Sequence, residues 1–151
     1  MFLFGYEHEW GMAYPADDEV GRLMIFREEK NNVLVWRGYE GKLTQYTIGR
    51  EDLWEIEGLL EERGELADVE KSGKEYMYPL DVPRDTFVFV DTEGRYRVFS
   101  DLMLACEKGK DVGIDAIIDV IFKIQDILKK NGVGVTMLTE EDLDNTYSQD
   151  T

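Results

Sequence analysis

Short runs of β-branched and aromatic residues, separated by turn residues, mark the first third of the chain as sheet. The runs 22–28 (RLMIFRE) and 33–39 (VLVWRGY) are joined by EKNN, whose asparagines accept the positive φ of a tight reversal. The run 43–48 (LTQYTI) alternates with period two, as a strand with one wetter face does. The pattern predicts three antiparallel strands that form a meander.

The period changes to that of a helix after residue 50. Acidic residues occupy the first turn of REDLWEIEGLLEER, where the helix macrodipole favours negative charge. Apolar residues recur at helical spacing at Leu53, Ile56, Leu59 and Leu60. We predict an amphipathic surface helix over 51–63, ended by Gly64.

The second half of the chain begins with a predicted hairpin. TFVFV (86–90) and YRVF (96–99) flank DTEG, in which Gly94 can take the left-handed position that closes the turn. Because TFVFV is apolar on both faces, we place it inside the sheet. The preceding segment YMYPLDVP (76–83) is extended by its prolines and is a candidate edge strand.

Helical patterns dominate the rest of the chain. SDLMLACEKGK (100–110) predicts a short helix with a serine cap, and 111–132 predicts a long, largely covered one that ends in lysines and a glycine. VGVTML (133–138) is a candidate last strand. Thr139 and Asp142 have the spacing of a capping box for one or two further turns.

The order of these elements predicts the fold class. Strands joined by short turns, with helices after them instead of between every pair, indicate α+β: an antiparallel sheet, meander plus hairpin, with two main helices packed on one face. A chain of 151 residues is near the common size for one domain. We expect a single domain over 1–138 and an acidic C-terminal tail over 139–151.

Composition adds a strong charge imbalance. Apolar residues make up 43% and charged residues 33%, and 33 acids against 17 bases give a net charge of -16. That charge repels phosphate backbones and anionic lipids, so we expect neither nucleic acid nor a membrane surface as a partner. It attracts basic proteins or cations, although an acidic surface also simply keeps a small domain in solution.

The compartment follows from what the sequence lacks. Cys106 is the single cysteine and cannot form an intramolecular disulfide. The start of the chain lacks the basic region of a signal peptide, and every long apolar segment is interrupted by charges. We expect a cytoplasmic protein.

His8, the only histidine, stands between Glu7 and Glu9. On a strand the two glutamates point to one face and the histidine to the other, so the three cannot converge on one ion. One histidine and one distant cysteine do not make a zinc site. We expect a solvated or capping histidine, no metal site and no cofactor.

Asp111, Asp115 and Asp119 lie four residues apart and share one helix face. Such a row could hold Mg²⁺ or Ca²⁺, which prefer oxygen ligands. Acids early in a helix and lysines late in it are also what the macrodipole favours, and no calcium-loop motif is present. We interpret the row as helix chemistry.

The acidic helix is the leading functional candidate. Residues 51–70 hold nine acids against Arg63 as the single base, and residues 139–151 add five more acids. Carboxylates beside an exposed tryptophan would steer and anchor a basic protein partner, whereas a solvated face explains the same pattern. The hypothesis is a non-enzymatic interaction module that binds through Glu51, Asp52, Trp54, Glu55, Glu61 and Glu62.

Two alternatives remain open. The first is a small-molecule sensor or an enzyme that uses carboxylates and tyrosines in a cleft beside the sheet. Its pocket residues would be Glu7, His8, Glu9, Asp17, Asp18, Trp36, Tyr39 and Tyr46. The second is a homodimer formed through apolar surface around YMYPLDVP.

Overall fold

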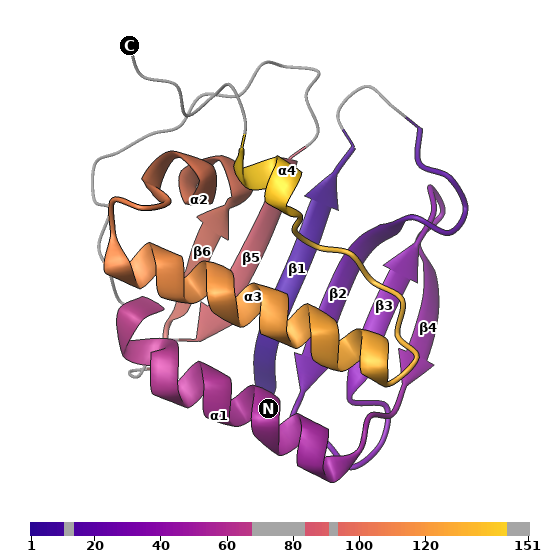
Figure 1. Cartoon of the computed structure of the whole chain (residues 1–151). Helices are drawn as coiled ribbons and strands as arrows, with labels where there is room; N and C mark the ends of the chain where they lie inside the picture. Colours follow the sequence, from indigo (N-terminus) through magenta and orange to yellow (C-terminus); the bar gives the residue numbers. More distant parts are fainter. Residues whose placement is uncertain (11–13, 68–83, 91–93, 145–151) are drawn as a thin grey trace.

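A computed structural model describes residues 1–10, 14–67, 84–90 and 94–144 of the chain. Six strands and four helices follow one another in the order shown in Figure 1. The strands are β1 (Phe2–Glu9), β2 (Val20–Phe26), β3 (Val33–Arg37), β4 (Lys42–Tyr46), β5 (Arg84–Val90) and β6 (Tyr96–Ser100). The helices are α1 (Arg50–Ala67), α2 (Asp101–Glu107), α3 (Val112–Lys130) and α4 (Glu140–Leu143).

The sheet is antiparallel throughout, with the strand order β4-β3-β2-β1-β5-β6. The predicted α+β class, the meander and the β5–β6 hairpin are confirmed, and β5 lies inside the sheet as expected. The first strand, which the pattern of short runs did not place, lies between the two halves of the sheet. It joins the meander to the hairpin.

The two faces of the sheet differ in cover. Figure 1 shows α1 and α3 in front of one face, which we call the inner face, and no described helix on the other, the outer face. The inner-facing side chains are buried, because strand geometry sends alternate residues to the same side. They are Phe4, Tyr6, Leu23, Ile25, Val33, Val35, Phe87, Phe89 and Phe99.

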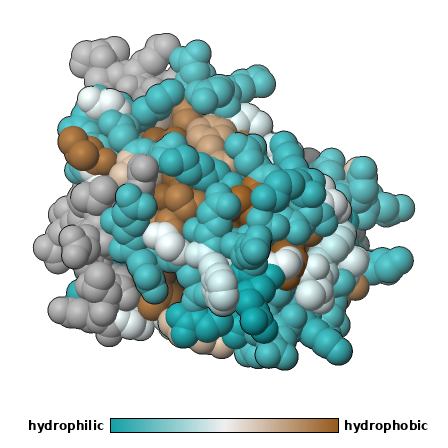
Figure 2. Space-filling model, turned by 60° about the horizontal axis from the view of Figure 1, so that its bottom comes forward, coloured by the Kyte–Doolittle hydropathy of each residue, from teal (hydrophilic) through white to brown (hydrophobic). Residues whose placement is uncertain are grey.

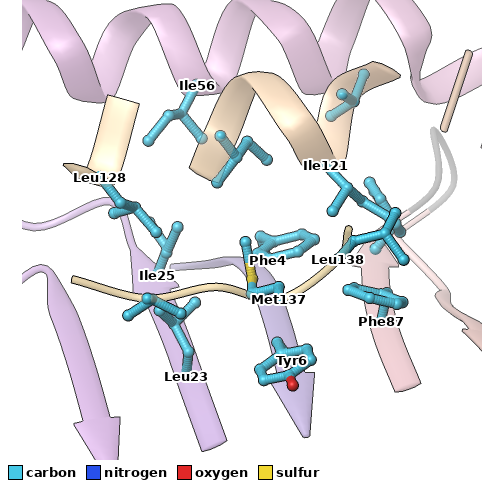
Figure 3. Packing of buried hydrophobic residues seen from close by; sticks show 14 of the residues in the cluster. Phe4, Tyr6, Leu23, Ile25, Ile56, Phe87, Ile121, Leu128, Met137 and Leu138 are labelled. Carbon is cyan, nitrogen blue, oxygen red and sulfur yellow. The ribbon is translucent and has the colours of Figure 1, made fainter. Parts of the chain in front are cut away.

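Helix α3 supplies the opposite half of the core. Its apolar stripe includes Ile121 and Leu128, which face the sheet residues Phe4, Ile25 and Phe87 in Figure 3. Asp111 caps the helix by accepting hydrogen bonds from the backbone N–H groups of Gly113 (2.8 Å) and Ile114 (3.2 Å). The predicted long helix is therefore confirmed, with Asp111 as the cap that precedes its first residue.

Helix α1 packs beside α3 and buries Leu53 and Ile56 against it. It continues to Ala67, so the predicted end at Gly64 is wrong. A glycine inside a helix costs only about 1 kcal/mol relative to alanine, which packing of the preceding turns against α3 offsets.

Residues 133–138 lie in no strand of the sheet, which corrects the sequence-based prediction. The segment crosses the inner face beside α3, with Val133, Val135 and Met137 buried. Gln125 of α3 holds it: the side-chain oxygen accepts from Met137 N (2.5 Å) and Leu138 N (3.1 Å). Its amide donates to the Leu138 carbonyl (3.1 Å). Period-two burial here reflects packing onto the sheet, not pairing within it.

The described part of the tail is ordered around one buried side chain. Thr139 and Asp142 form the predicted capping box of α4, and Leu143 is buried in the core. The serine-capped helix is also confirmed, as Ser100 accepts from Met103 N (3.1 Å). YMYPLDVP and the residues after 144 lie outside the described residues. Within residues 1–10, 14–67, 84–90 and 94–144, no helix combines the length and apolar character needed to cross a bilayer.

Candidate functional site

The solvent side of α1 carries a tryptophan among carboxylates. Because a helix turns about 100° per residue, six side-chain positions share one stripe, which we call the α1 surface. These are Glu51, Trp54, Glu55, Gly58, Glu61 and Glu62, all exposed. Trp54 is 60% exposed, and a Cβ added at Gly58 would meet nothing within 4 Å. The surface is thus an acidic strip with an indole ring on one side and a bare notch at its centre.

The carboxylates of this surface form no close ion pair within the described part of the chain, although Glu51 and Glu55 lie near enough to the Lys130 ammonium to help raise its pKa. Glu51, Glu55, Glu61 and Glu62 form no ion pair with any described residue. Among the described residues, the only cation over Trp54 is Arg50, whose guanidinium carbon lies 5.8 Å from the ring centroid. Figure 2 views this lower side of the molecule and shows it mostly hydrophilic, with separate hydrophobic patches.

Asp52 is the one member of the predicted partner site that contacts another element. Its Oδ1 lies 2.7 Å from Lys130 Nζ, and its Oδ2 accepts from Asn131 Nδ2 (3.0 Å). These hydrogen bonds lower the pKa of Asp52. Asp52 therefore ties the start of α1 to the end of α3, and the α1 surface excludes it.

A groove of about 780 Å³ runs beside Trp54, between the first turns of α1 and the loop at 27–32. Its floor is shaped by Asn32, which is buried and holds both backbone groups of Ile48: Ile48 N donates to Asn32 Oδ1 (2.9 Å), and Asn32 Nδ2 donates to Ile48 O (3.2 Å). The charges that line the groove cancel, because three are basic (Arg27, Lys30 and Arg50) and three are acidic (Glu28, Glu29 and Glu57). The groove offers space for a side chain or strand next to the indole, without adding to the acidic field.

A second candidate site lies on the inner face at the end of β1, and we call it the His8 cluster: Tyr6, His8 and Asp85. His8 and Asp85 are directly opposite one another on β1 and β5. Asp85 is 8% exposed, and its Oδ1 accepts from the Tyr6 hydroxyl (2.8 Å) and bonds to His8 Nδ1. His8 also stacks edge-on against Trp10, with ring centroids 4.4 Å apart.

Electrostatics couple the three groups. Burial, followed by the charge of Asp85, raises the pKa of Tyr6, so its hydroxyl stays protonated and donates. Burial lowers the pKa of His8, but the hydrogen bond to Asp85 and its negative charge outweigh burial and raise it overall. With Nδ1 bonded to Asp85, His8 Nε2 has no hydrogen-bond partner among the described residues.

His8 lines a recess of about 320 Å³. Its other walls are Tyr6, Trp10, Asp18, Glu19, Val20, Gly134 and Thr136. An indole ring and two exposed carboxylates around a histidine are groups that bind a small cation. The described residues contain no group of three His, Cys, Asp or Glu side chains placed to hold a metal ion.

The structure separates most members of the predicted alternative pocket. Glu7 and Glu9 point to the outer face, where they pair with Arg22 and Arg84, and Trp36 lies on the same face under Arg22. Only His8 and Asp18 meet at the recess.

The remaining predicted pocket residues lie near the β3–β4 turn and on β4. Tyr39 packs against Tyr14 with centroids 5.2 Å apart, and the backbone of Asp17 lies against Gly38. Tyr46 packs on the core with the Arg37 guanidinium carbon 5.6 Å from its ring centroid.

The aspartate row of α3 is also resolved into separate roles. Asp111 is the helix cap, Asp115 accepts from Gly109 N (2.9 Å), and Asp119 pairs with Lys123 (3.1 Å). Each of the three carboxylates therefore has its own partner within the described chain.

Tyr6 and Asp85 were missed by the sequence analysis. The signal for Tyr6 is present, because alternation along GYEHE places it on the same face as His8. The signal for Asp85 is an acid in register with Phe87 and Phe89 on an apolar face. The pairing of β1 with β5 brings them together, and neither segment alone predicts it.

No protein-family model matches the chain, and no curated protein matches it in sequence.

Proposed function

We propose that this protein is a binding module that engages a basic partner protein through the α1 surface. The observation that carries the proposal is Trp54, which is 60% exposed among carboxylates that form no ion pair with a described residue. Maintaining a large aromatic ring in water costs free energy, and tryptophan is the residue type most enriched at binding hot spots. The notch at Gly58 gives the backbone room for a partner's side chain next to the ring.

The carboxylates and the Trp54 ring have different roles in this proposal. The carboxylates at Glu51, Glu55, Glu61 and Glu62 raise the association rate with a basic surface, whereas Trp54 slows dissociation. The four carboxylates span about 16 Å along α1, enough to face three turns of a partner helix or a strand of about five residues. Association should weaken as salt is raised.

The test is affinity capture from native extract, followed by binding measurements with the captured basic protein. Trp54→Ala should weaken binding about 10- to 100-fold, mainly through faster dissociation. The double reversal Glu51→Lys with Glu55→Lys should slow association and flatten its salt dependence. The matched control is Asp17→Lys with Glu40→Lys, which changes net charge equally at exposed positions away from α1. Binding unaffected by Trp54→Ala, or equal losses in both double variants, would refute the assignment.

We propose as a second candidate that the recess beside the His8 cluster binds a small molecule bearing an amine. It is supported by His8 Nε2, which has no partner among the described residues and lies in a wall shared with Trp10 and Asp18. Neutral His8 would accept a hydrogen bond from the ammonium group, and the indole and carboxylates would stabilise its charge.

The probe for this candidate is a library of small primary amines, observed through the ring signals of His8 and Trp10 by NMR. Binding should strengthen as His8 loses its proton and should disappear in Trp10→Ala. An absence of amine-induced shifts, or binding that is independent of pH, would exclude this use of the recess.

A further inference from the structure

The outer face of the sheet carries apolar side chains and has no described helix over it. One row crosses all six strands in register: Gln45, Leu34, Met24, Gly5, Val88 and Val98. Three apolar side chains of this face are prominent: Tyr96 (67% exposed) and Val98 (61%) on edge strand β6, and Leu43 (41%) on the opposite edge strand, β4. Contiguous apolar patches of this kind mark interaction sites on proteins.

The centre of this face is hollowed. A register shift between Phe2 and Phe4 turns the Phe2 ring outward over Gly5, where an added Cβ would lie 2.9 Å from the ring. The Phe2 ring meets Phe26 and Tyr96 edge-on at 5.8 Å and 5.7 Å. A groove of about 350 Å³ lies among these rings. A sheet face with apolar side chains and a central groove fits another sheet face, whose side chains can interdigitate with it.

The charges on the outer face indicate which kind of partner it binds. The charged residues that point outward from the described strands are Glu7, Glu9, Arg22 and Arg84, which sum to zero. They form two pairs, Glu7 with Arg22 (3.8 Å) and Glu9 with Arg84 (2.6 Å). In a chain of net charge -16, this locally neutral face is where a second copy meets the least repulsion. The face also carries both positively and negatively charged side chains, so a twofold arrangement can set an arginine of one copy opposite a glutamate of the other.

We propose that the outer face is a homodimer interface in which two sheets pack face to face. Six strands about 4.8 Å apart and five residues long cover roughly 400 Å² in projection, which is small beside the roughly 800 Å² per partner of a standard interface. The dimer therefore dissociates on dilution. Since each copy carries the same large negative charge, salt strengthens this dimer, whereas it weakens binding of a basic partner to α1. The two proposals are independent and distinguishable by the sign of their salt dependence.

The test is the mass in solution by sedimentation and light scattering, over a wide range of protein concentration and at low and high salt. We expect a monomer–dimer equilibrium that shifts to dimer with salt. Val98→Lys should weaken it at least about 100-fold, because the twofold axis buries the new charge twice. Val112→Lys, at a position 79% exposed at the start of α3, is the control and should dimerise like the unmodified chain.

A second variant keeps the result interpretable if Val98→Lys folds poorly. Leu43→Lys, on edge strand β4, should also weaken the dimer while leaving the thermal unfolding of the monomer nearly unchanged. The proposal is overturned by a monomeric mass at every concentration and salt, or by a dimer that both outer-face variants leave intact.

Discussion

The bond between His8 and Asp85 makes the stability of the fold depend on pH in a defined direction. The fold raises the pKa of His8, so the stabilisation from this pair is fully present below the ordinary histidine pKa. It is lost as pH rises through the raised value. Replacing Asp85 by Asn keeps an acceptor for the Tyr6 hydroxyl and removes the charge that favours protonated His8.

The magnitude follows from the two bonds that converge on Asp85 Oδ1. A hydrogen bond to a charged group contributes about 1.5–3 kcal/mol and a neutral one about 0.5–1.5 kcal/mol. Losing the charge should therefore cost about 1–2 kcal/mol while His8 is protonated. Burial of His8 remains in Asp85→Asn and should bring the pKa of His8 below that of the unmodified protein.

Two measurements test this, helped by the fact that His8 is the only histidine. Its ring signals give the pKa by NMR titration without assignment. Urea unfolding at about pH 5.5 and about pH 8.5 gives the free energy of unfolding on either side of the transition. The difference between unmodified protein and Asp85→Asn should shrink by about 1 kcal/mol from the lower to the higher pH. Asp17→Asn, an exposed charge removed elsewhere, is the control. The coupling would be refuted by an unchanged His8 pKa in Asp85→Asn. It would also be refuted if the difference in free energy of unfolding between the two proteins were the same at both pH values.

Three further substitutions test the packing. Gln125→Leu removes the hydrogen bonds to residues 137 and 138 and should lower the free energy of unfolding, measured in urea, by about 2–4 kcal/mol. An unchanged urea midpoint would show that these hydrogen bonds do not hold the segment in place. Asn32→Ala leaves both backbone groups of Ile48 without their partner and should cost about 1–3 kcal/mol in the same assay. Ile121→Ala should cost about 2–5 kcal/mol by calorimetry, against less than about 0.5 kcal/mol for the exposed control Val112→Ala.

Local patterns in the sequence were sufficient for most elements of the fold. Short β-branched and aromatic runs between turn residues identified β2 to β6, and the isoleucine stripe identified α3, because these patterns follow directly from backbone geometry. Residues 133–138 show the limit of that reasoning. A segment lying on a sheet alternates in burial as a strand does, and only the partner of its backbone groups, here Gln125, separates the two cases.

The candidate sites show the same limit more sharply. Trp54 and the carboxylates of α1 were predictable because a helix face is a local property of the sequence. The His8 cluster was not, because His8 and Asp85 are 77 residues apart and meet only through the pairing of β1 with β5. The local part was predictable: Glu7 and Glu9 flank His8 but lie on the opposite face of the sheet, as the period of a strand requires.

The position of β1 in the sheet constrains when the sheet can form while the chain is being synthesised. β1 is synthesised before the other strands of this sheet, and one of its edges pairs with β2, the next of these strands to be made. Its other edge pairs with β5, which is made only after α1 and the residues that follow it. Until then a phenylalanine-rich strand has unpaired backbone groups on one side, which is a template for pairing with other chains. Ribosomal pausing before residue 90, or truncation there, would therefore yield aggregates in place of a half-folded domain.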